Sequence, residues 1–266
     1  MNILYVGDVM AEMGIRAVEL LLPVIRQEEH IDVVIAQAEN VTNGKGLSTA
    51  DYERLKAAGV DGFTGGNHTP AHKDTLNMLS DSRIPVVGPA NTEDCPGPGF
   101  KYVDSPAGNV LIISLLGKIV GRDAEKTVAN PIQKIEEILA SQADVKRVAT
   151  VANIHGDYSS EKVVMGHYLD GRVSVVVGDH WHIPTADARV LPKGTAHQTD
   201  VGMCGSLDSS LGVTLASVIP RWRDGIQTKN ILETNGPLQF NALLVEIDEK
   251  TGLAVRAEAI RDILEA

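Results

Sequence analysis

Short apolar runs alternate with amphipathic segments along residues 1–90 of the chain. The apolar runs of strand length cover residues 2–7, 32–38, 60–66 and 84–88. The segments with helical spacing cover residues 17–30, 48–59 and 71–81. We expect Pro23 to kink the first helix and Ser48 to cap the second. This regular alternation predicts βαβ units and a largely parallel sheet.

The alternation loosens after residue 90, although strands and helices are still expected. Further strands are predicted over residues 100–104, 109–117, 147–155, 173–182, 239–248 and 253–263. Further helices are predicted over residues 130–144 and 159–171, the second with a good N-cap. The last two strands read as an antiparallel pair that closes one edge. Since no repeat or linker interrupts the pattern, we expect a single domain over residues 1–266.

Composition and charge narrow the possible partners. The chain is 43% hydrophobic and 22% charged, which is typical of a globular protein. Its formal charge is −11, so it lacks the excess of basic residues that is typical of a protein that binds duplex nucleic acid. Metal ions could still supply positive charge at a local phosphate site.

The expected location is the cytoplasm, without a membrane partner. No apolar run approaches the length of about 18 residues that a membrane span needs. The first residues read as a strand and lack the basic start of a signal peptide. Cys95 and Cys204 belong to no paired motif, which suits a reducing compartment.

Potential metal ligands stand where the predicted strands end. In chain order they are Asp8, Glu39, Asn40, Asn67, His68, His155, His180 and His182. Because the carboxyl ends of parallel strands line the ligand crevice of an α/β sheet, we expect these side chains to gather in one place. His180 and His182 are two residues apart and would face the same side of a strand.

Each of these residues alone has an ordinary explanation. Asp8 could be a turn residue, Glu39 and Asn40 could open a loop, and His155 could be a core histidine. The joint pattern favours a site, because no comparable polar set stands at the other strand ends. The remaining histidines join it less readily, although His197 could line the site; they are His30, His72, His167 and His197.

The donor set mixes carboxylate, amide and imidazole groups and contains no thiolate. It therefore excludes a structural cysteine-type zinc site and suits iron or manganese, with zinc also open. Seven or eight donors are too many for one transition metal, so we expect two divalent or trivalent ions that share a bridging carboxylate. Such a pair can hold a bridging hydroxide and stabilise in-line displacement at phosphorus.

A series of motifs resembles the calcineurin-like metallophosphoesterases, and more narrowly their bacterial YmdB-type branch, which is linked to phosphodiesterase activity on cyclic nucleotides. The matching segments are GDV (7–9), AEN (38–40), KGL (45–47), GNHT (66–69), NIHGDYSSEK (153–162), VVGDHWH (176–182) and RVLPKGTAHQTDVGM (189–203). GNH alone occurs across the superfamily, whereas the complete series is specific to the branch.

The resemblance implies an α/β/β/α sandwich with mixed sheets and an active site at the carboxyl ends of strands. It also implies roles for the candidate residues. Glu39 would bridge the two metals, and His68 would act as general acid on the leaving group. The residues implied for one metal are Asp8, Asn40 and His182, and those for the other are Asn67, His155 and His180.

Some positions depart from the pattern of the superfamily. Met10 stands two residues after Asp8, where a histidine ligand is usual, and the resemblance implies that Asn40 compensates. The other departures are Pro70, where an aromatic residue is expected, and Asp179 and Trp181, where small or hydroxyl residues are expected. These side chains could change substrate access or the hydrogen bonds around the ligands.

The expected activity is hydrolysis of a small phosphodiester such as a 2′,3′- or 3′,5′-cyclic nucleotide. A phosphomonoesterase or an RNA-end hydrolase remains an alternative. A metal-binding regulatory protein with little turnover is the rival class, but His68 would then have no task. An amidohydrolase is a second rival, although its His-x-His pair usually comes at the first strand.

Substrate and assembly are the least readable properties of the sequence. No nucleobase-binding signature is present, although Tyr158, Trp181, His197 and residues 204–212 could form a pocket wall. The C-terminal strand pair leaves an edge that a second subunit could cover, so the chain could form a homo-oligomer.

Overall fold

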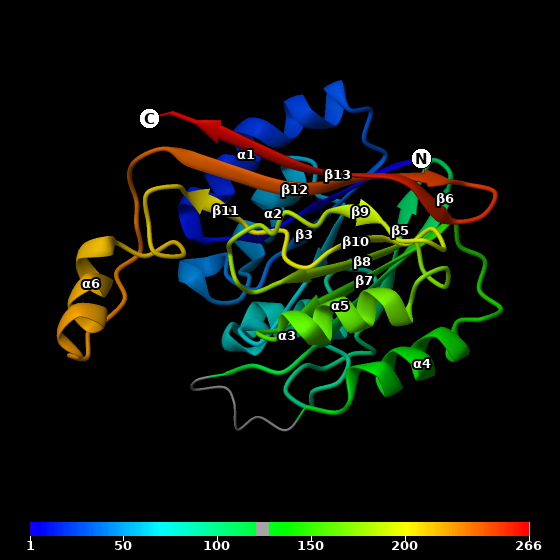
Figure 1. Ribbon diagram of the computed structural model, residues 1–266, viewed down its shortest axis with the longest axis horizontal. Coiled ribbons are helices and arrows are strands. Elements are labelled where there is room, and N and C mark those ends of the chain that lie inside the picture. The colour runs from blue at the N-terminus through cyan, green and yellow to red at the C-terminus, as the bar shows by residue number, and fades with distance from the viewer. Residues whose placement is uncertain (121–127, 266) are drawn as a thin grey trace.

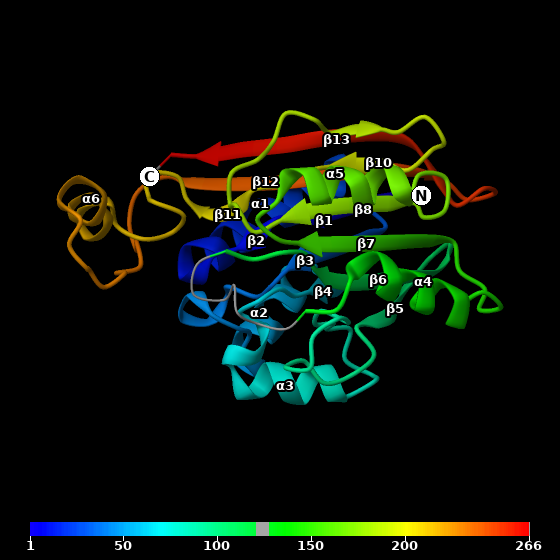
Figure 2. The ribbon, with the colours of Figure 1, turned by 60° about the horizontal axis from the view of Figure 1, so that its bottom comes forward.

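The computed structural model describes residues 1–120 and 128–265 of the chain. Two mixed β-sheets stack on one another, and helices cover their outer faces (Figures 1 and 2). This is the metallophosphoesterase-type sandwich that the family resemblance implies, in place of the single sheet that the apolar pattern suggests.

The first sheet has the strand order β2–β11–β12–β1–β3–β4, with β13 also paired to β12. Its strands are β1 (Asn2–Val6), β2 (Asp8–Val9), β3 (Val33–Gln37), β4 (Gly62–Thr64), β11 (Met203–Ser206), β12 (Leu238–Asp248) and β13 (Leu253–Leu264). As expected, β1, β3 and β4 are parallel, and β12 and β13 form an antiparallel pair. The strand predicted over residues 84–88 is wrong, since only an isolated bridge joins Phe63 to Val86.

The second sheet has the strand order β5–β6–β7–β8–β10–β9. Its strands are β5 (Phe100–Ser105), β6 (Gly108–Leu116), β7 (Ala149–His155), β8 (Val175–Asp179), β9 (Arg189–Val190) and β10 (Ala196–Gln198). The central strands β6, β7, β8 and β10 run parallel, and the edge strands β5 and β9 are antiparallel to their neighbours. The strand predicted over residues 173–182 ends early, at Asp179.

Helices cover the two outer faces. The first sheet is covered by α1 (Ala11–Glu28), α2 (Thr49–Ala57) and α3 (Lys73–Ser80), and the second by α4 (Pro131–Ser141) and α5 (Ser159–Tyr168). The first helix begins earlier than expected and continues through Pro23. The side chain of Ser48 caps α2 as predicted, but α5 follows Tyr158 without a side-chain cap.

The core lies in layers because strand side chains alternate between the two faces of each sheet. Ile3 and Tyr5 point into the layer between the sheets, whereas Leu4 and Val6 pack toward α1 to α3. Full burial of each large apolar side chain contributes about 1.5–3 kcal/mol. These layers fix the directions in which the strand ends point.

Cys95 and Cys204 are both buried, and Cys204 is a free thiol. Across the part of the chain that the structure describes, no helix has both the length and the apolar character needed to cross a bilayer.

Candidate active site

The predicted donors meet because both sheets end their parallel strands at one edge. From the first sheet, the segments after β1, β3 and β4 carry Asp8, the Glu39–Asn40 pair and the Asn67–His68 pair. From the second sheet, β7 ends on His155, and His180 follows the end of β8. Two sheets thus supply one cluster, where the sequence suggested a single sheet.

Glu39 lies at the centre of the cluster and is fully buried. Its Oε1 atom is 3.2 Å from Nε2 of His155 and 3.1 Å from Nδ2 of Asn40. Its Oε2 atom accepts a hydrogen bond of 2.7 Å from the backbone N–H of His68. One carboxylate therefore faces ligand candidates on two sides, which is the position a bridging ligand requires.

On one side of Glu39 lie Asp8, Asn40 and His182. The Nδ2 atom of Asn40 is 3.3 Å from Oδ1 of Asp8 and 3.2 Å from Nε2 of His182. The side-chain amide thus turns its nitrogen toward this group, whereas metal ligation would need its oxygen. A half-turn of the amide exchanges the two nearly isosteric ends, so the position of Asn40 suits a ligand.

On the other side of Glu39 lie Asn67, His155 and His180. The Oδ1 atom of Asn67 is 2.8 Å from Nε2 of His155. Glu39, His155 and His180 each offer one ligand atom, and these atoms lie within 4.8 Å of one another. The rings of His155 and His180 have centroids 4.6 Å apart and meet edge to face at 68°.

His180 and His182 do not sit on a strand, as the sequence suggested, but in the loop after β8. Both have positive φ angles, 101° and 63°, which are rare for residues other than glycine. The backbone N–H of His180 donates a hydrogen bond of 3.2 Å to Asp8. Such strained backbone is concentrated at functional sites, where the surrounding structure holds it in place.

Gly66 allows the backbone to pass directly beneath the cluster. A Cβ atom at this position would collide with Glu39 and lie 2.5 Å from Cγ of His155. A neighbouring glycine, Gly65, is equally crowded, by the side chain of Thr69. Close approach, and not an unusual φ angle, therefore requires glycine here.

Burial and charge shift the pKa values of the cluster. Burial, together with the nearby Asp179 carboxylate, raises the pKa of Asp8 well above its ordinary value. Burial lowers the pKa of His180 and of His182 to about 4, so both imidazoles are neutral at pH 7. Burial opposes the charged form of Glu39, but the imidazoles of His155 and His68 outweigh it and hold this pKa well below its usual range.

Asp179 holds the ring of His155 from behind. Its Oδ1 atom is 2.7 Å from Nδ1 of His155, and its Oδ2 atom accepts hydrogen bonds from Tyr5, Gln37 and Asn153 at 2.9, 3.0 and 2.5 Å. A carboxylate at Nδ1 fixes the tautomer and leaves Nε2 for the cluster. The sequence analysis expected Asp179 to change substrate access or the hydrogen bonds around the ligands, and the pairing of β7 with β8 places one such hydrogen bond at His155.

His68 contacts the cluster from its rim. Its Nδ1 atom is 2.8 Å from Oδ1 of Asn40, and its side chain is 29% exposed, whereas Glu39 is fully buried. With Nδ1 bonded to an amide, Nε2 is the nitrogen left to exchange a proton with a substrate. This placement suits a general acid better than a ligand.

The other unusual residue beside the histidines, Trp181, belongs to a buried polar network. Its backbone N–H donates to Asp200 at 3.0 Å, and its indole N–H donates to the carbonyl of Asp157 at 3.1 Å. The ammonium of Lys162 lies 4.2 Å from the ring centroid of Trp181 and 2.9 Å from Asp200. Trp181 thus fixes the loop that carries His180.

Several other candidates lie away from the cluster. Pro70 lies within a short turn of helix over Thr69–Ala71 and borders a small cavity that Asn67 also lines. His197 is buried against the backbone of Val176, and Tyr158 lines a groove beside α5. His72 accepts a hydrogen bond from the backbone N–H of Asp74 at the start of α3.

A cavity of about 580 Å³ opens onto the cluster. Its lining includes the polar residues Glu39, His68 and His180 and the apolar residues Leu211 and Trp222. Such a volume is in the range of sites for small ligands. The sequence pointed to residues 204–212 as a wall but missed Trp222, which no local pattern marks.

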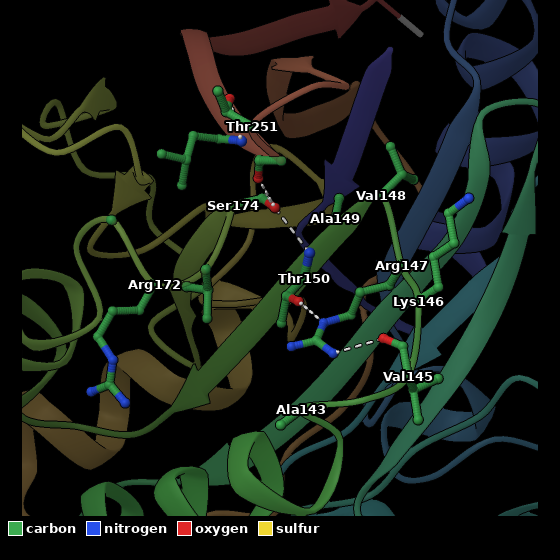
Figure 3. A pocket seen from close by; sticks show the side chains of 14 residues that line it. Ala143, Val145, Lys146, Arg147, Val148, Ala149, Thr150, Arg172, Ser174 and Thr251 are labelled. Atoms are coloured by element: carbon green, nitrogen blue, oxygen red, sulfur yellow. Dashed lines mark hydrogen bonds between the residues drawn. The ribbon is translucent and has the colours of Figure 1, made fainter.

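Figure 3 shows a second cavity, of about 350 Å³, that opens near the amino ends of β7 and β8. Arg147 donates to Thr150 at 2.9 Å, and the hydroxyl of Ser174 accepts from the backbone N–H of Thr150 at 2.9 Å. Arg172, which also lines this cavity, pairs with Glu136 outside it, and the lining contains neither a carboxylate nor an imidazole. It lies at the opposite strand ends and is not the catalytic site.

The residues of the cluster fit a pair of metal ions. Carboxylate, amide and imidazole groups converge from two sides on one buried carboxylate, and the set is of the kind that binds iron, manganese or zinc. Among the residues that the structure describes, no lysine or arginine forms a salt bridge with Asp8 or Glu39, which are fully buried. Bound cations would balance the charge of these carboxylates.

The chain is similar to known proteins over almost its whole length. A family model described as YmdB-like protein matches residues 4–260 of the chain. The chain is similar to a Bacillus subtilis (strain 168) protein named 2′,3′-cyclic-nucleotide 2′-phosphodiesterase. The two are 35% identical over 263 residues, which cover 98% of this chain and 96% of that protein.

Two solved structures are similar over almost their whole length. The crystal structure of a novel phosphatase from Mycoplasma pneumoniae has a TM-score of 0.91 and 30% identity, and covers 100% of this chain and 94% of that chain. The crystal structure of a hypothetical protein from Thermus thermophilus has a TM-score of 0.88 and 35% identity, and covers 99% of this chain and 100% of that chain.

Proposed function

The chain belongs to the YmdB-like family, and from this premise we propose that it is a metal-dependent phosphodiesterase that acts on small cyclic nucleotides. The family and the similarity to a phosphatase structure make it a phosphoesterase. The finer choice of 2′,3′-cyclic nucleotides is supported by the name of the Bacillus subtilis relative. The 3′,5′-cyclic isomers stay a prediction.

The observation that carries the proposal is the position of Glu39 between two groups of ligand candidates. In the proposed arrangement, two metal ions would share Glu39 as a ligand. One ion would be held by Asp8, Asn40 and His182, and the other by Asn67, His155 and His180. When bound, such ions provide a water nucleophile at neutral pH and positive charge for the phosphoryl oxygens. Iron or manganese is the proposed identity.

His68 completes the reaction from the rim of the cavity. The amide of Asn40 fixes Nδ1 of His68 at 2.8 Å, and the bond from its backbone N–H to Glu39 holds the residue beside the cluster. Protonated Nε2 can then donate to the departing oxygen of the ester. Imidazole suits this role because it exchanges protons near neutral pH.

Hydrolysis of 2′,3′-cyclic nucleotides by purified protein loaded with Mn²⁺ tests the proposal. His68→Ala should lower the rate by about 10²–10⁴-fold. Its metal content should stay unchanged, since His68 is not among the proposed ligands. His72→Ala is the matched control, because His72 caps α3 outside the cluster and should keep full activity.

Two outcomes would contradict the proposal. If His68→Ala hydrolysed the substrate at the wild-type rate, His68 would not be the general acid. Metal-loaded protein that hydrolyses no phosphodiester would instead support a regulatory metal-binding protein. The single domain, the cytoplasmic location, the absence of membrane and duplex partners, and a homo-oligomer stay predictions.

A further inference from the structure

A long excursion separates two strands that are direct neighbours. Ser206 of β11 pairs with Leu238 of β12, and the backbone N–H of Leu207 donates to the carbonyl of Pro237 at 2.9 Å. A hairpin of two residues could join such strands. The chain instead runs through residues 207–237, including α6 (Leu215–Asp224), which projects from the body of the molecule (Figures 1 and 2). Connections of this length are usually functional.

Backbone hydrogen bonds and close packing fix the excursion in place. Its two limbs are joined by the N–H of Thr214 with the carbonyl of Ile231 at 2.8 Å, and by the N–H of Glu233 with the carbonyl of Gly212 at 2.9 Å. Gly212 lies so close to Met10 that a Cβ atom would collide with its side chain. The excursion therefore forms a defined wall.

Residues of this wall and of the metal-ligand cluster line the same cavity. Val218 and Trp222 are one helical turn apart on α6, and both line the cavity together with Leu211 and Leu232. The same cavity is lined by four members of the cluster and by two polar residues of the excursion; they are Glu39, Asn40, His180 and His182, and Arg221 and Asn230. A ligand that fills this space needs a charged end and a flat or apolar end.

Trp222 is the most exposed large apolar side chain of the wall. It is 83% exposed, so it stabilises the fold little, yet it borders the catalytic cavity. An indole ring can stack on any nucleobase, since every base has a π-face. We propose that the wall binds the base of a nucleotide whose phosphate lies at the cluster, and that Trp222 stacks on this base. This proposal rests on the function proposed above for the nature of the substrate.

Two properties of the enzyme follow from this assignment. The substrate is a nucleotide, because a phosphodiester without a base would leave the wall uncovered. Discrimination among bases is weak, since stacking depends little on base identity.

Equilibrium binding tests the assignment without requiring turnover. Calorimetry with Mn²⁺-loaded protein compares adenosine 3′-monophosphate with inorganic phosphate. Trp222→Ala should weaken binding of the nucleotide by about 5- to 50-fold and leave binding of phosphate unchanged. Trp222→Phe should restore most of the affinity. Ile219→Ala is the matched control, because Ile219 is exposed on the same helix but does not line the cavity.

The outcomes separate this assignment from the proposed reaction. The assignment of a base-binding wall would be overturned if Trp222→Ala weakened the binding of nucleotide and phosphate equally, or weakened neither. It would also be overturned if the wild-type protein did not bind the nucleotide. Nucleotide binding that depends on Trp222, in a protein that hydrolyses no phosphodiester, would keep the wall and reject the reaction.

Discussion

Replacing Asp179 by asparagine preserves the size of a buried side chain but removes its charge. The carboxylate is surrounded by donors, with Nδ1 of His155 at 2.7 Å from Oδ1 and the hydroxyl of Tyr5 at 2.9 Å from Oδ2. An amide must turn its N–H₂ end toward one of these sides. On the Oδ2 side it meets the N–H₂ groups of Gln37 and Asn153, which cannot accept. Toward His155 it forces the ring proton onto Nε2, the atom that faces Glu39.

Both orientations weaken the site by an amount that can be estimated. Loss of a group that orients a ligating histidine typically costs about 10- to 100-fold in metal affinity. This corresponds to about 1.4–2.8 kcal/mol. A buried donor left without an acceptor costs about 1–3 kcal/mol of folding stability. Asp179→Asn should therefore bind Mn²⁺ about 10- to 100-fold more weakly and unfold at lower urea concentration.

A Mn²⁺ titration against a competing chelator measures the first effect, and urea unfolding of the metal-free protein measures the second. Asp170→Asn provides the control, because Asp170 is also buried but its carboxylate accepts hydrogen bonds from the backbone N–H groups of Lys193 and Thr195 and not from a proposed ligand or the loop that carries His180. It should lose stability and keep its metal affinity. Unchanged affinity in Asp179→Asn, or equal losses in both variants, would refute the role assigned to Asp179.

Three further predictions concern the site and the core. Gly66→Ala should lose bound metal, measured by elemental analysis, because its methyl group would displace the carboxylate of Glu39. Lys162→Met should cost about 3–5 kcal/mol in urea unfolding, since it leaves the Asp200 carboxylate buried without its cation. Burial raises the pKa of the Cys204 thiol to about 12, so this side chain stays protonated at pH 8 and should react with a thiol reagent only after unfolding, which mass spectrometry can check.

The positions of most strands and of the donors along the chain could be predicted because both depend on local patterns. Apolar runs and helical spacing identified β1, β3 and β4, and the rule for carboxyl ends placed Asp8 and Asn67 at one edge. The predicted strand over residues 84–88 failed for a local reason. Pro85 has no N–H to continue a ladder, so pairing stops at the bridge between Phe63 and Val86.

The details of the site depend on contacts between distant segments, which no local pattern records. His155 and Asp179 are partners in the parallel register of β7 and β8, so the orientation of this imidazole becomes visible only when the strands pair. The positive φ angles of His180 and His182 are likewise imposed by the fold, since histidine does not favour them.

Met10 shows how the missing histidine ligand and the cavity wall are connected. The superfamily usually has a histidine at this position, whereas here Met10 is buried, and Gly212 of the excursion packs directly on it. An imidazole bound to metal would place a polar ring where the wall now rests on a thioether. The wall therefore meets the usual position of a ligand at Met10, whereas Trp222 of α6 lines another part of the cavity. If Trp222 stacks on the base as proposed, substitutions in α6 should change nucleotide binding without disturbing the residues proposed to hold the metals.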